Sequence, residues 1–283
     1  MRHLDLPDSP SRLPVLGLGT WRMGESRGRR AAEVAAVRAA LELGYRLIDT
    51  AEMYGEGGAE EIVGEALEAA IRAGDVRRED VVVVSKVYPH NASRQGTIAA
   101  CDRSRRRLRL DHLDLYLLHW RGQHPLGDTV DAMQELVAKS QVAHWGVSNF
   151  DREDMEELAD LADDFATDQV WFSPGERGAE FDLLPWLQQH RRPMMAYSPI
   201  DMGRRARDRT LRDIGGALGL SAAQVALAWV IGRPGVVAIP KSTDPAHLRE
   251  NLAAAELTLD AETLARIDAA FPPPDARAPL AMN

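Results

Sequence analysis

Val81-Val82-Val83-Val84-Ser85-Lys86 is the stretch that decides the fold, because four apolar residues in a row end in two polar ones. Leu115-Tyr116-Leu117-Leu118 repeats the pattern and is followed by His119. A strand with one face in water alternates polar and apolar residues, whereas a strand buried on both faces is continuously apolar. These two stretches therefore predict strands of a parallel sheet that is covered by helices.

Eight strand candidates of this kind alternate with helical patterns along the chain. They lie at residues 15–20, 47–49, 81–86, 114–119, 143–148, 167–171, 194–198 and 236–240. Such alternation is typical of a closed barrel or of a doubly wound sheet. A doubly wound dinucleotide-binding sheet would carry Gly-x-Gly-x-x-Gly, but Gly17-Leu-Gly19 has Arg22 where the third glycine would stand. The sequence therefore predicts an α/β protein, a (β/α)8 TIM barrel.

The predicted helices have recognisable ends. The pattern at residues 31–43 stops at Gly44, a C-cap glycine, and Asp151 is expected to cap the helix that follows it. Ser221-Ala-Ala-Gln224 fits a capping box. One barrel needs roughly 250 residues. We therefore expect residues 1–283 to form a single domain, with a short N-terminal β-hairpin and an irregular, proline-rich C-terminal tail after Phe271.

Composition excludes several classes of function. The formal net charge of −9 argues against nucleic acid as a partner. No apolar run approaches the ~20 residues of a membrane span, and the N-terminus lacks the apolar core of a secretory signal. A single cysteine, Cys101, fits a reducing cytoplasm, and the eight histidines show no metal-ligand spacing. The basic run Arg103, Arg105–Arg107 and Arg109 is interpreted as a solvated helix face.

Nearly every strand candidate ends in a polar group. These groups are Asp49 (with Tyr54 close behind), Lys86, His119, Ser148-Asn149, Gln169, Tyr197-Ser198 and Lys241-Ser242. In a (β/α)8 barrel the active site lies at the C-terminal ends of the strands. Each residue alone has an ordinary structural explanation, such as a helix cap or core packing. Together at one end of one barrel they predict a catalytic site.

Aspartate, tyrosine, lysine and histidine can together form a proton-donating device. A tyrosine has a pKa near 10 and is a poor acid at neutral pH, but a nearby ammonium group lowers that pKa. We expect Lys86 to act in this way on Tyr54 and Asp49 to fix Lys86 by a buried salt bridge. His119 is expected to donate a hydrogen bond to a substrate carbonyl or to join the proton relay.

These segments resemble the aldo-keto reductase family. The resemblance rests on Gly17-Leu-Gly-Thr-Trp21, Leu47-Ile-Asp-Thr-Ala51 through Tyr54, Val84-Ser-Lys-Val87, Leu117-Leu-His-Trp120, Gly146-Val-Ser-Asn-Phe150, Ala196-Tyr-Ser-Pro199 and Ile239-Pro-Lys-Ser242. The match runs in order from about Leu13 to Asn251 and looks closest to short bacterial members that act on methylglyoxal and other small carbonyls. It implies a monomeric enzyme that reduces aldehydes with NADPH, with ketones as further candidate substrates. Tyr54 would be the general acid, supported by Lys86, Asp49 and His119.

The resemblance also implies a cofactor site across the barrel top. Ser148, Asn149 and Gln169 would bind the nicotinamide carboxamide, and Tyr197 would stack on its ring. The remaining cofactor residues would be Gly19, Thr20, Trp21, Ser198, Ile200, Lys241, Ser242, Thr243, His247, Glu250 and Asn251. Ser148-Asn149 could instead cap the next helix. Whether Arg204, Arg205, Arg207 or Arg209 contacts the cofactor stays open.

Two departures from the family pattern bear on specificity. His247 stands where the family often has an arginine that grips the adenosine 2′-phosphate, so selectivity for NADPH over NADH is expected to be weaker. Asp201 stands where the loop after the seventh strand often has glycine. Trp21, Tyr88 and Trp120 are expected to line the substrate pocket, and the short tail predicts an open pocket for small, 2-oxo or aryl aldehydes.

Two other functions compete with this hypothesis. Lys86 could form a Schiff base, as in barrel aldolases. The chain could also be an NADP(H)-binding, redox-sensing regulatory module whose turnover is secondary. Trapping of a substrate on Lys86 with borohydride would support the first, and slow turnover with very tight cofactor retention the second.

Overall fold

Eight parallel strands form the centre of the computed structural model, which describes residues 1–7 and 9–282. They are β3 Leu18–Gly19, β4 Leu47–Asp49, β5 Val82–Val87, β6 Leu113–Leu118, β7 Val142–Ser148, β8 Asp168–Trp171, β9 Met194–Tyr197 and β10 Val236–Ala238. They pair in chain order from β3 to β10. The ring closes where Gly17 N donates to Ala238 O at 2.9 Å and Gly19 N to Pro240 O at 3.1 Å. The predicted barrel is confirmed.

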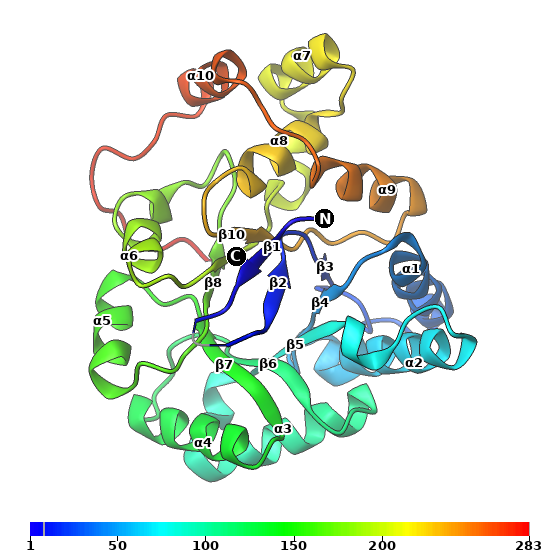
Figure 1. Ribbon diagram of the computed structural model, residues 1–283, viewed down its shortest axis with the longest axis vertical. Coiled ribbons are helices and arrows are strands. Elements are labelled where there is room, and N and C mark those ends of the chain that lie inside the picture. The colour runs from blue at the N-terminus through cyan, green and yellow to red at the C-terminus, as the bar shows by residue number, and fades with distance from the viewer. Residues whose placement is uncertain (8, 283) are drawn as a thin grey trace.

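Helices surround this ring on the outside (Figure 1). They are α1 Arg30–Leu43, α2 Gly58–Ala73, α3 Arg94–Leu108, α4 Leu126–Ala138, α5 Arg152–Leu161, α6 Leu183–Gln189, α7 Arg209–Leu218, α8 Ala222–Ile231, α9 Pro245–Ala254 and α10 Ala261–Ala270. Short 3-10 turns are η1 Arg27–Arg29, η2 Tyr54–Gly57, η3 Arg78–Asp80, η4 Pro89–Asn91, η5 Gly178–Glu180, η6 Asp201–Gly203 and η7 Arg205–Arg207. No single described helix is long and apolar enough to cross a membrane; α7 and α8 pass that test only as a pair, bent by 91°.

The predicted helix ends are confirmed. Gly44 terminates α1 with a left-handed backbone (φ 108°). The Asp151 carboxylate accepts hydrogen bonds from the N–H groups of Glu153 and Asp154, each at 2.9 Å, at the start of α5. Ser221 and Gln224 form the capping box of α8. These local signals set where each helix leaves the barrel rim.

An N-terminal β-hairpin closes one end of the barrel, as predicted. Strands β1 His3–Asp5 and β2 Arg12–Pro14 pair antiparallel and cross the middle of the ring in Figure 1. Leu6 and Leu13 are buried in the same apolar cluster as Leu115, Met195 and Val237 of the barrel strands. This plug fills the N-terminal end of the barrel and leaves the C-terminal ends of the strands open.

The basic run of α3 is only partly a solvated face. Arg106 is exposed as expected, but Arg107 donates to the fully buried Glu60 at 2.9 Å and Arg103 to the buried Glu52 at 3.2 Å. The prediction was wrong for these two arginines. Two carboxylates beneath the barrel rim need cationic partners, because an unpaired buried charge is costly.

The C-terminal segment after Phe271 has no regular secondary structure through residue 282, as predicted. Its last described residue, Met282, lies at a cavity on the opposite end of the barrel from the hairpin. The tail therefore reaches the pocket, in contrast to the expectation that it would contribute little over it.

Candidate active site

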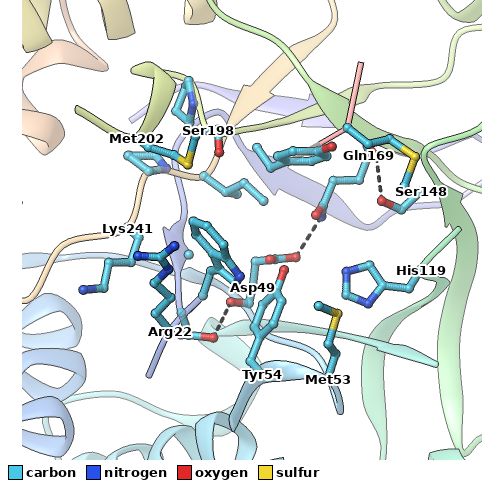
Figure 2. A pocket seen from close by; sticks show the side chains of 18 of the residues that line it. Arg22, Asp49, Met53, Tyr54, His119, Ser148, Gln169, Ser198, Met202 and Lys241 are labelled. Atoms are coloured by element: carbon cyan, nitrogen blue, oxygen red, sulfur yellow. Dashed lines mark hydrogen bonds between the residues drawn. The ribbon is translucent and has the colours of Figure 1, made fainter. Parts of the chain in front are cut away.

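A cavity of about 590 Å³ lies at the C-terminal ends of the strands, and Figure 2 shows many of its side chains. Fourteen of the predicted site residues line it: Gly19, Thr20, Trp21, Asp49, Tyr54, His119, Trp120, Ser148, Asn149, Gln169, Tyr197, Ser198, Ile200 and Lys241. Eight further lining residues were not predicted: Arg22, Met53, Pro199, Met202, Gly203, Ile239, Pro240 and Met282. The barrel therefore brings strand ends that are far apart in sequence to one cavity.

Lys86 and Asp49 form a buried ion pair beneath this cavity. Lys86 Nζ donates to Asp49 Oδ1 at 2.8 Å, to Asp49 Oδ2 at 2.7 Å and to Thr50 O at 2.9 Å. Gln169 Nε2 also donates to Asp49 Oδ1, at 2.8 Å. Burial lowers the pKa of Lys86, and the Asp49 carboxylate opposes that effect. The predicted salt bridge is present, and its three acceptor contacts fix the ammonium group.

Tyr54 lies above this pair on η2. Lys86 Nζ is 5.1 Å from the centroid of the Tyr54 ring, and the His119 ring stands edge-on to it at 5.7 Å between centroids. Burial, with the negative charge of Asp49 second, raises the pKa of Tyr54 well above 10. The pKa is thus raised and not lowered as expected, because desolvation of the phenol is the largest effect on it. Tyr54 therefore holds its proton firmly at neutral pH.

His119 is neutral at pH 7. Burial lowers its pKa well below 6.5, and the nearby Lys86 charge lowers it further. Its Nδ1 is buried and has no hydrogen-bond partner within residues 1–7 and 9–282. A neutral imidazole has one N–H, so His119 can donate one hydrogen bond at the cavity without adding a charge.

Polar side chains from β7, β8 and β9 are linked along one side of the cavity. Ser148 Oγ donates to Gln169 O at 2.7 Å, and Asn149 Nδ2 donates to His119 O at 3.0 Å. The Tyr197 hydroxyl donates to Asn149 Oδ1 at 2.8 Å. The alternative that Ser148-Asn149 caps the next helix does not hold, because Asp151 caps α5.

Two cations stand at the cavity away from this chain of hydrogen bonds. They are Lys241, which follows β10, and Arg22, whose guanidinium lies 4.4 Å from the centroid of the Trp21 ring. Neither forms a salt bridge with any described residue. Figure 2 shows the two side chains next to each other. Sequence reasoning missed Arg22, although its position directly after Trp21 could have revealed it.

Five predicted cofactor residues lie outside the cavity. They are Ser242, Thr243, His247, Glu250 and Asn251, on α9 and just before it. Ser242 Oγ accepts from Asp244 N at 3.1 Å, Glu250 accepts from Ser221 Oγ at 3.2 Å, and His247 is exposed. Asn251 is buried and hydrogen-bonded to Tyr45. Their predicted roles require a ligand that extends beyond the cavity along α9.

Tyr88 lies behind the pocket wall instead of forming it. Its ring packs edge-on against Trp120, with 5.9 Å between centroids, and Trp120 in turn contacts His119. Trp21 and Trp120 line the cavity as predicted, and three methionines, Met53, Met202 and Met282, complete its apolar surface. Tryptophan and methionine side chains therefore form much of the apolar wall.

Lys86 and the arginines after β9 lie outside the cavity. Arg204, Arg205, Arg207 and Arg209 do not line the cavity, and Arg205 pairs with Asp201 at 2.5 Å. Lys86 is fully buried and does not line the cavity either, so its amine is not presented to a substrate as a Schiff-base lysine would be. Among the residues described, no group of three or more His, Cys, Asp or Glu side chains could hold a metal ion.

Comparison with known proteins identifies the family. The profile of the aldo/keto reductase family matches residues 15–271. The chain belongs to the aldo/keto reductase family. It is 50% identical over 277 residues to methylglyoxal reductase YeaE of Escherichia coli (strain K12), covering 95% of both chains. It is 35% identical over 258 residues to glyoxal reductase of Bacillus subtilis (strain 168), covering 91% of this chain and 88% of that protein.

A solved structure agrees with this assignment. A crystal structure of an aldo-keto reductase from Klebsiella pneumoniae in complex with NADPH matches the reductase with a TM-score of 0.93. The two sequences are 45% identical, and the match covers 100% of this chain and 99% of the other. The resemblance inferred from the strand-end motifs is thus confirmed, and the protein is an oxidoreductase.

Proposed function

We propose that this reductase converts small aldehydes, including 2-oxoaldehydes such as methylglyoxal, to alcohols with NADPH, and that Tyr54 is the general acid. The observation that carries the proposal is the buried Lys86–Asp49 pair directly beneath Tyr54, with neutral His119 across the phenol ring at the cavity. The relatives named methylglyoxal reductase and glyoxal reductase support the choice of substrate.

The cavity fits NADPH by the chemistry of its donor set. Ser148, Asn149 and Gln169 present hydroxyl and amide groups suited to a carboxamide, and Tyr197 offers a flat ring beside them. Arg22 and Lys241 supply the positive charge that phosphate groups require. When bound, the dihydronicotinamide supplies the hydride. The NADPH complex of the Klebsiella relative supports this cofactor.

The residues of the chain would handle the proton and the carbonyl. Neutral His119 donates a hydrogen bond to the carbonyl oxygen and orients it toward Tyr54. Tyr54, whose pKa is raised by burial, keeps its proton until negative charge develops on that oxygen and then donates it. The nearby Lys86 ammonium, fixed by Asp49 and Thr50 O, stabilises the resulting phenolate.

Replacement of the Tyr54 hydroxyl tests this proposal. Tyr54→Phe should lower kcat by about 10² to 10⁴-fold, because a general acid contributes that much. NADPH affinity, measured by fluorescence titration, should stay within about two-fold, because the hydroxyl is assigned to proton donation and not to cofactor binding. Tyr116→Phe is the matched control, since Tyr116 is buried in the core and does not line the cavity. Turnover of Tyr54→Phe within a few-fold of wild type would show that Tyr54 is not the acid.

A further inference from the structure

Asp201 is a buried carboxylate in the segment between β9 and α7, and it is 3% exposed. Its Oδ1 accepts hydrogen bonds from Trp171 Nε1 at 3.0 Å and from Ser173 Oγ at 2.6 Å. Its Oδ2 accepts from Arg205 Nε at 2.5 Å. Both oxygens are therefore satisfied by donors outside the cavity, and the carboxylate joins the end of β8 to the start of η7.

The backbone around Asp201 adopts a conformation that side chains rarely allow. Ser198 (φ 47°), Asp201 (φ 49°) and Met202 (φ 52°) all lie in the left-handed region. Non-glycine residues stay there only where their surroundings hold them. A glycine, which the family often has at this position, could adopt this backbone but could not anchor it.

The same segment forms one wall of the cavity. Ser198, Pro199, Ile200, Met202 and Gly203 line it, and Figure 2 shows Ser198 and Met202 on the side away from Tyr54. Asp201 itself does not line the cavity.

The surroundings of the Asp201–Arg205 pair are closely packed. Arg205 lies 5.0 Å from the centroid of the Phe271 ring, which ties the segment to the end of α10. A Cβ atom on Gly175 would come within 2.6 Å of Asp201 Oδ2, so the cluster is closely packed.

We propose that Asp201 is a positioning residue that holds residues 198–203 in their ligand-binding shape before NADPH arrives. The inference rests on the proposed function, because it concerns the same cofactor site. If the segment loses its anchor, only a fraction of the molecules has the competent wall, and the apparent Kd rises by the inverse of that fraction. At saturating NADPH the competent form is restored, so kcat is preserved. The variants should thus separate cofactor affinity from turnover.

The test removes the side-chain donors to Asp201 one at a time and then together. Trp171→Phe deletes the indole N–H, and Ser173→Ala deletes the hydroxyl, which also accepts hydrogen bonds from Gly175 N and Glu176 N. The double variant should raise the NADPH Kd about ten-fold, since each lost bond goes to a charged group. Its kcat at saturating NADPH should stay within about two-fold. Asp201→Asn should act in the same direction through the lost pairing with Arg205. Trp145→Phe is the matched control, because that buried indole N–H has no hydrogen-bond partner among the described residues.

Two outcomes would overturn the inference. One is an NADPH Kd within two-fold of wild type in both Asp201→Asn and the double variant, with an unchanged circular dichroism spectrum. The other is a fall in kcat without a change in Kd. If Asp201→Asn does not fold, the double variant alone decides. Failure of the wild-type protein to bind NADPH would contradict the proposed function itself, which separates the two failures.

Discussion

Burial sets the protonation state of His119 at this site. It is 7% exposed, and its pKa lies well below 6.5 because burial penalises the charged form. The folded protein therefore keeps the imidazole neutral at pH values at which the unfolded chain would protonate it. Stability from this group is fully present above the unfolded pKa and is lost as the pH falls below 6.5.

Stability measured against pH tests this point. Between about pH 7.5 and about pH 5.5 the free energy of unfolding of the wild type should fall by about 1 kcal/mol more than that of His119→Gln, which cannot titrate. Urea unfolding at the two pH values measures both. An equal loss in the two proteins would mean that the pKa of His119 is the same in the folded protein as in the unfolded chain.

At this scale the sequence predicted that Asp49, Lys86 and His119 lie at one end of the barrel, because each stands at or directly after the end of a buried strand. It could not give the direction of the pKa of Tyr54. That direction depends on how deeply the fold buries the phenol and on how near it brings the Asp49 carboxylate, and neither can be read from the sequence.

At the scale of an element, α3 carries charge inward as well as outward. In the sequence its arginines were interpreted as a solvated face, because Glu60, the partner of Arg107, is 47 residues away. Glu60 is fully buried, and its pKa is raised by burial and lowered by Ser85, Ser104 and Arg107. Helix ends at Gly44, Asp151 and Ser221 were predictable, since their signals are local, whereas this pairing exists only once α2 and α3 pack together.

Loss of the inward cation should destabilise the protein. Arg107→Met leaves the Glu60 carboxylate without its cation and should lower the free energy of unfolding by about 3 kcal/mol. Arg106→Met, on the same helix but exposed, should change it by less than about 0.5 kcal/mol. Thermal or urea unfolding compares the two variants. Similar stabilities would show that the pair contributes nothing beyond an exposed arginine.

At the scale of the whole molecule, stability and chemistry occupy opposite ends of the barrel. The hairpin fills one end with Leu6 and Leu13, and the cavity opens at the other. The order and pairing of the strands followed from the apolar runs. The position of Met282 at the cavity could not be predicted, because an irregular tail has no sequence periodicity that fixes its path.

This separation predicts a variant that loses stability and keeps activity. Leu13→Ala should cost about 2–5 kcal/mol, because Leu13 is 1% exposed and packs inside the barrel. The value of kcat/KM at a temperature where the variant is folded should stay within about two-fold. A large drop in kcat/KM with unchanged stability would mean that the hairpin shapes the active site.

The most direct test of the central claim is cofactor consumption. Purified protein is mixed with methylglyoxal and NADPH, the loss of dihydronicotinamide absorbance is followed, and the assay is repeated with NADH. We predict consumption that requires both protein and carbonyl and is faster with NADPH, and a smaller preference for NADPH in Lys241→Met because one of the two cations assigned to the phosphate groups is gone. No consumption across a panel of small and aryl aldehydes, with NADPH still bound in a fluorescence titration, would contradict the account and favour a cofactor-binding regulatory role.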